Sequence, residues 1–152
     1  MDTLRWLHLS DVHFSDGESY EIKRMRDSII DKMKEVFEKN KVDFVVLSGD
    51  LAYQGGGYDA NLKKFIESLV DVSGVSIDEL FIVPGNHDLK RTQMRSVLLN
   101  GMRTEQFKFE KETIEQLQKD FKKYMTFYNK VKGENSNYIY RLVKKEKYNI
   151  FL

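Results

Sequence analysis

The sequence predicts an α/β fold in which helices flank a parallel sheet. Three short apolar runs occupy residues 4–10, 44–47 and 80–84, and two stretches with helical spacing of apolar residues separate them. This order of strand, helix, strand, helix and strand favours parallel strands joined by right-handed crossovers. The carboxyl ends of the strands then meet at one edge of the sheet, where ligands bind in open α/β folds.

The first predicted strand, residues 4–10, leads directly into Asp11, Val12 and His13. Alternate residues of an extended segment point the same way, so the carboxylate and the imidazole could reach one metal ion. His8 lies roughly 10 Å back along the strand from Asp11, too far for the same ion. We expect His8 to be a core or edge histidine with a hydrogen-bond partner.

Two helical patterns, residues 20–39 and 59–70, are predicted to cover the sheet. The apolar residues of the first recur three or four apart and would form one face: Ile22, Met25, Ile29, Met33, Val36 and Phe37. The second begins at Asp59, a suitable N-cap, and carries a similar stripe: Leu62, Phe65, Ile66 and Leu69.

The second predicted strand is an unbroken apolar run, residues 44–47, as expected for a strand buried on both faces of a parallel sheet. Gly49 allows the backbone to turn, and Asp50 then stands at the strand's carboxyl end. The triple glycine at 55–57 has no Gly-Lys-Ser/Thr after it, so a phosphate loop is excluded. We expect a mobile lip beside the site.

The third predicted strand ends at Pro84 and is followed by Gly85-Asn86-His87-Asp88. These four residues favour turns and polar chemistry, and they follow a buried strand. The three loop tips together predict a metal site at one edge of the sheet. Its candidate residues are Asp11, His13, Asp50, Asn86, His87 and Asp88.

Residues 90–132 have a charged helical pattern outside the strand–helix rhythm. Thr113 and Gln116 are spaced as a capping box, although a helix that starts near Thr104 is equally compatible. This helical excursion could shade the active edge or cover the sheet.

Residues 138–143 and 148–152 predict two strands joined by a turn, and the chain ends on three apolar residues. An apolar strand edge invites pairing with another chain. We therefore expect residues 1–152 to form one domain that is incomplete at its C-terminus, or to self-associate through this edge.

The composition excludes several classes of protein. There is no cysteine, so neither disulfides nor thiolate metal sites are available. No signal peptide is visible, and no apolar run approaches the roughly 18 residues of a membrane span; we expect a cytoplasmic protein. Residues 1–100 hold 13 Lys and Arg against 17 Asp and Glu, whereas residues 101–152 hold 12 against 7. The basic half could meet a phosphate-bearing partner, although such a surplus is more often a solvated face.

The motifs Asp11-Val-His13, Gly49-Asp50 and Gly85-Asn-His-Asp88 resemble the first three signature blocks of the calcineurin-like metallophosphoesterase superfamily, over residues 1 to about 90. The resemblance implies the N-terminal part of a four-layer sandwich. It also implies hydrolysis of phosphodiesters or phosphomonoesters by two divalent ions, Mn, Fe or Zn, with a bridging hydroxide. By this resemblance, Asp11 and His13 bind one ion, Asp50 bridges both and Asn86 binds the second. His87 then protonates the leaving group, and Asp88 orients it.

The chain departs from the family where further ligands are expected. The family adds another His and a Gly-His-X-His block, but this sequence contains only His8, His13 and His87. We therefore expect at most one ion to be well held, and little or no activity from this chain. One alternative is a catalytically disabled domain kept as a binding or assembly module. Another is an ordinary nucleotide-binding α/β domain whose polar tips are only loops.

The expected substrate is a phosphate ester. Leu51-Ala-Tyr-Gln-Gly55 follows Asp50 where the Ser/Thr phosphatases of the superfamily carry Asp-Arg-Gly, which argues against phosphoproteins. Residues 7–13 are similar to the phosphodiesterase and nuclease-like branches, among them cyclic-nucleotide phosphodiesterases and the DNA-repair nuclease. A nucleotide or nucleic-acid partner is thus compatible. Without an aromatic and basic groove in the sequence, a nuclease acting on DNA is the minor alternative.

Overall fold

The structure is a computed structural model that describes residues 3–15, 17, 19–104, 106, 110–136, 142–145 and 148–151. The elements are β1 (Trp6–Leu9), α1 (Tyr20–Phe37), β2 (Phe44–Ser48), α2 (Ala60–Ser73), the 3-10 turn η1 (Ile77–Glu79), β3 (Leu80–Val83), α3 (Gln93–Arg103), α4 (Lys111–Gln118), the 3-10 turn η2 (Lys119–Phe121), α5 (Lys122–Lys132), β4 (Leu142–Lys144) and β5 (Asn149–Phe151). The predicted α/β fold, with a parallel sheet flanked by helices, is confirmed.

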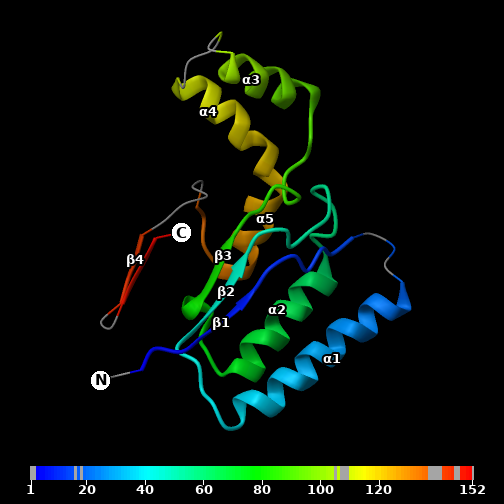
Figure 1. Cartoon of the computed structure of the whole chain (residues 1–152), viewed down its shortest axis with the longest axis vertical. Helices are drawn as coiled ribbons and strands as arrows, with labels where there is room; N and C mark the ends of the chain where they lie inside the picture. Colours follow the sequence, from blue (N-terminus) through cyan, green and yellow to red (C-terminus); the bar gives the residue numbers. More distant parts are fainter. Residues whose placement is uncertain are drawn as a thin grey trace.

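The main sheet has the strand order β1-β2-β3, and both neighbouring pairs are parallel. Leu9 of β1 is level with Leu47 of β2, and Ser48 is level with Val83 of β3. The three strands therefore end close together, and the loops that leave them start from the same edge (Figure 1).

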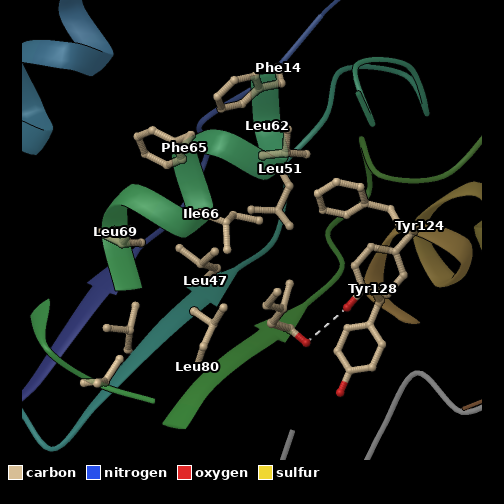
Figure 2. Packing of buried hydrophobic residues seen from close by; sticks show 14 residues of the cluster. Phe14, Leu47, Leu51, Leu62, Phe65, Ile66, Leu69, Leu80, Tyr124 and Tyr128 are labelled. Carbon is tan, nitrogen blue, oxygen red and sulfur yellow. Dashed lines mark hydrogen bonds between the residues drawn. The ribbon is translucent and has the colours of Figure 1, made fainter. Parts of the chain in front are cut away.

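One face of the sheet is covered by α2, with α1 packed beside it, and α5 lies behind β3 (Figure 1). Figure 2 shows the core between these elements. Seven aliphatic side chains of this core have no exposed surface: Val45, Leu47, Leu51, Leu62, Ile66, Leu69 and Leu80. Each stabilises the fold by about 1.5–3 kcal/mol relative to an exposed side chain. The hydroxyl of Tyr124 donates to the carbonyl of Ile82 at 3.0 Å, which ties α5 to β3 (Figure 2).

The packing face of α1 agrees with the predicted one at Ile29, Met33 and Phe37, which are partly buried, and differs from it elsewhere. Ile22, Met25 and Val36 are exposed, whereas Arg26 is 5% exposed. The face toward the core also carries Ile30 and Met33, which are partly buried. The buried face thus includes Arg26, which the apolar spacing did not predict and which has partners in the loop after β1.

The helix boundaries test two capping predictions. The Asp59 side chain accepts hydrogen bonds from the amides of Asn61 and Leu62, so its role as N-cap of α2 is confirmed. The capping box at Thr113 is wrong, because α4 begins at Lys111 and Thr113 lies inside its first turn. None of the described helices is both long enough and apolar enough to cross a bilayer.

The predicted helical excursion at 90–132 contains α3, α4, η2 and α5, with residues 105 and 107–109 outside the described part. Helices α3 and α4 extend away from the sheet, on the side of its strands' carboxyl ends (Figure 1). Only α5 contributes to the main core, through Tyr124, Phe127 and Tyr128.

A short antiparallel pair, β4 and β5, covers part of the other face of the sheet. Val143 packs with Phe44 and Phe81, and the rings of Phe44 and Tyr148 are 5.0 Å apart. The predicted strands are thus seen over Leu142–Lys144 and Asn149–Phe151. Residues 138–141, 146–147 and 152 of these predicted strands and their turn lie outside the described residues.

Candidate metal centre

Three of the predicted side chains meet at the carboxyl edge of the sheet. Asp11 and His13 follow β1 and Asp50 follows β2, and one potential ligand atom from each lies within 4.8 Å of the others. Nε2 of His13 is 3.8 Å from Oδ1 of Asp11. Asp11 is exposed, His13 is partly buried and Asp50 is 9% exposed, so the cluster is open on one side.

All three residues have left-handed backbone conformations, with φ of 58° at Asp11, 46° at His13 and 53° at Asp50. Such conformations cost on the order of 1–3 kcal/mol for a residue other than glycine. Hydrogen bonds between the two loops hold them: the amide of Asp11 donates to the carbonyl of Gly49 at 3.2 Å, and that of His13 to the carbonyl of Asp50 at 2.9 Å. The fold therefore stabilises this arrangement at the expense of local strain.

The third loop packs directly against the carboxylate of Asp50. The backbone amide of His87 donates to Oδ1 of Asp50 at 2.8 Å. The other carboxylate oxygen of Asp50, Oδ2, has no hydrogen bond to the described residues. A Cβ atom on Gly85 would lie 2.2 Å from the same Oδ1. Glycine is thus required at position 85, since a side chain would displace the carboxylate.

His87 lies beside the cluster, in contact with two aromatic rings. Its ring is 5.2 Å from that of His13 at 87°, and it stacks on Tyr53 at 5.3 Å and 15°. Nδ1 of His13 and Nδ1 of His87 are buried without a hydrogen-bond partner among the described residues. The side chain of Asn86 is exposed and makes no hydrogen bond within that part of the chain.

Asp88 is fully buried below this surface, and its carboxylate accepts four hydrogen bonds. Oδ1 receives the Ala52 amide at 2.8 Å and the Tyr58 hydroxyl at 2.7 Å, while Oδ2 receives the amides of Leu51 at 3.2 Å and Gly85 at 2.8 Å. Burial, followed by the charge of Asp88, raises the pKa of Tyr58 well above its usual range, so the hydroxyl remains a donor. Asp88 therefore joins the loop after β2 to the loop after β3.

The expected contact between Asp88 and the imidazole of His87 is not formed. The hydrogen bonds of the carboxylate go to the four donors above, because buried amides require acceptors. The ring of His87 is instead held by its stack on Tyr53. A four-residue motif does not reveal this difference, since three of the four donors belong to the loop after β2, far from the motif in the sequence.

Arg26, which the sequence analysis did not single out, holds the loop that carries Asp11 and His13. Its Nη2 donates to the carbonyls of Val12 at 2.8 Å and His13 at 3.2 Å, and its guanidinium lies 3.5 Å from the centroid of the Phe14 ring. The one feature of the sequence that could have indicated the burial of Arg26 was its position one turn before Ile30 on α1. A charged residue there ordinarily indicates a solvated face.

These residues fit one divalent metal ion. Two carboxylates and an imidazole suit a transition metal. Ligand atoms about 2.1 Å from one ion lie at most about 4.2 Å apart, so a small closing movement brings the three donors into range. His8 is not available, because its Nε2 is hydrogen-bonded to the hydroxyl of Ser48, which confirms the role expected for it.

Comparison with known proteins agrees with this geometry. The family described as calcineurin-like phosphoesterase matches residues 4–151. The chain is also 31% identical, over 99 residues, to the "uncharacterized metallophosphoesterase-like protein YydB" of Bacillus subtilis (strain 168). That match covers 65% of this chain and 20% of the relative, so it spans about a fifth of the relative's length.

Proposed function

The chain belongs to the calcineurin-like phosphoesterase family, and we propose that it forms the part of a metal-dependent phosphoesterase that holds the first ion and the proton donor. One observation carries this proposal: the ligand atoms of Asp11, His13 and Asp50 cluster within 4.8 Å at the edge where His87 also lies. An ordinary α/β domain has no need of three strained polar residues at this point.

Asp11, His13 and Asp50 would hold the first ion, and Asp50 with Asn86 would face the second. A divalent ion supplies Lewis acidity, which offsets the negative charge that develops on the phosphoryl oxygens during displacement. The protein's own contribution is to keep the donors in place. The amide of His87 orients the Asp50 carboxylate, and Arg26 holds the carbonyls of the Asp11–His13 loop.

His87 would donate a proton to the leaving group. Imidazole is the side chain whose ordinary pKa suits proton transfer near neutral pH. Tyr53 acts as a positioning residue, because its ring lies almost parallel to that of His87 and limits its tilt. We assign to Asp88 the indirect role of joining the loops on either side, in place of a contact with the imidazole.

The proposed substrate is a phosphate ester, with a diester favoured over a phosphoprotein. A binding or assembly module is the second candidate, because three histidines leave the second ion with two ligands. Four points stay predictions: a nuclease-type substrate, a cytoplasmic location, self-association at the C-terminal strand edge, and a single incomplete domain over residues 1–152.

Metal analysis tests the proposal. After dialysis against Mn²⁺ and then metal-free buffer, the chain should retain about one equivalent of metal. Asp50→Asn should lose it, since this residue contributes to both sites. Asp71→Asn, which removes an exposed carboxylate of α2, is the matched control. Equal and negligible metal in all three proteins would support the ordinary α/β domain.

Activity separates the enzyme from the module. We expect slow Mn²⁺-dependent hydrolysis of bis(p-nitrophenyl) phosphate, and His87→Ala should abolish it while metal content stays near normal. Loss of metal in His87→Ala would contradict the role of His87 as proton donor. Full metal occupancy without turnover of any diester or monoester would favour a binding module.

A further inference from the structure

A cavity of about 520 Å³ lies between the loop after β2 and helix α5. We call it the lysine pocket, because four lysines line it: Lys63, Lys122, Lys123 and Lys130. Asp59 also lines it and adds one negative charge, and its carboxylate caps α2 by accepting from the amides of Asn61 and Leu62. The pocket thus concentrates positive charge on a chain whose net charge is only +1.

Three of these charges are uncompensated. Lys63 pairs with Glu67 one turn along α2. Lys122, Lys123 and Lys130 are exposed and form no ion pair within the part of the chain that the structure describes. Lys123 and Lys130 are seven residues apart and so project from the same face of α5. Water and salt screen the repulsion among these exposed lysines, but their positive charges add to one another for an anion that enters the pocket.

The loop after β2 lines the lysine pocket and also contacts the candidate metal centre. The amide of Gly55 donates to the carbonyl of His87 at 2.9 Å, and Tyr53 of the same loop stacks on the His87 ring. A Cβ on Gly57 would lie 2.2 Å from the carbonyl oxygen of Phe14. Packing against Phe14 therefore requires glycine at position 57, and Gly55, Gly56 and Gly57 all line the pocket.

We propose that the lysine pocket binds a non-reacting phosphate group of a substrate that carries more than one phosphate. That another phosphate of the same substrate reacts at the metal centre rests on the proposed function. Binding of a phosphate in the lysine pocket itself requires no metal ion. The cavity volume is in the range of small-molecule sites. A partly open hollow bordered by α2, α5 and a loop suits a compact oligophosphate, because nucleic-acid chains follow extended grooves.

Calorimetry with inorganic tripolyphosphate tests this proposal on the full chain, in buffer with EDTA so that the metal centre cannot contribute. We expect a single site whose Kd increases at least tenfold in the double variant Lys123→Gln/Lys130→Gln. The control Lys34→Gln/Lys41→Gln removes the same charge from exposed positions outside the pocket and should change Kd less than twofold. Circular dichroism verifies that both variants are folded.

Several results would overturn the proposal: no binding at millimolar tripolyphosphate, equal weakening in the two double variants, or tighter binding of a single-stranded oligonucleotide. The last would identify a polymer site. These outcomes are independent of metal content and of turnover by the metal centre. A chain that binds tripolyphosphate but no Mn²⁺ would retain this inference and lose the proposed function.

Discussion

Replacing Asp88 with Asn tests whether this carboxylate stabilises the site from below. The Asn side chain has the same shape as that of Asp, but its NH₂ group, which can only donate, must take the place of one carboxylate oxygen. In the place of Oδ2 it would face the amides of Leu51 and Gly85. In the place of Oδ1 it would face the amide of Ala52, while the Tyr58 hydroxyl could turn and accept.

At least one buried N–H therefore loses its acceptor in either orientation. Each such group costs about 1–3 kcal/mol, and the charge assistance of the remaining bonds is also lost. We expect the free energy of unfolding to fall by about 2–4 kcal/mol. That is a large share of the roughly 5–15 kcal/mol typical of a domain.

Urea unfolding followed by far-ultraviolet circular dichroism, in metal-free buffer, measures this loss. The slope of the unfolding free energy against urea concentration should stay unchanged, while the urea concentration at the midpoint of unfolding decreases. Asp71→Asn is the control, because an exposed carboxylate should alter stability by no more than about 0.5 kcal/mol. A decrease of less than about 1 kcal/mol in Asp88→Asn would refute the reasoning.

Three further predictions follow from the same geometry. Gly85→Ala should weaken Mn²⁺ binding at least tenfold in calorimetry, because the added Cβ would lie 2.2 Å from the Asp50 carboxylate; unchanged affinity would contradict this. Arg26→Met should lower the free energy of unfolding by about 2–4 kcal/mol, since two loop carbonyls lose a charged donor. Arg24→Met, an exposed change on the same helix, is its control. Because burial and then Asp88 raise the pKa of Tyr58, folding keeps this hydroxyl protonated. The stabilisation that the protonated Tyr58 hydroxyl contributes to the folded state is complete below about pH 10 and is lost as the pH rises further. A free energy of unfolding that stays constant between pH 8 and 11 would argue against this contribution.

The elements of the fold could be predicted from local patterns. The unbroken apolar run at 44–47 indicated a buried strand, and Asp59 indicated the start of α2. The crossover rule then placed the three loop tips at one edge. This reasoning was sufficient to bring Asp11, His13 and Asp50 together, because parallel strands constrain where their ends lie.

The face of α1 and the contacts of His87 could not be predicted in this way. The apolar spacing indicated that Met25 faced the core, yet Arg26 is the residue that is buried. Its partners are backbone carbonyls, which every residue carries and which no sequence pattern distinguishes. Likewise, nothing in Gly85-Asn-His-Asp88 shows that the last carboxylate turns toward the amides of Leu51 and Ala52.

The sequence alone thus determined the order of strands and helices and the three polar ends that converge, since both follow from periodicity and chain direction. Only the tertiary structure decided which donors surround Asp88, which ring stacks on His87, and that lysines of α2 and α5 share one pocket. These features depend on distances between segments that lie far apart along the chain. Such distances are set by how the elements pack, and local patterning does not encode them.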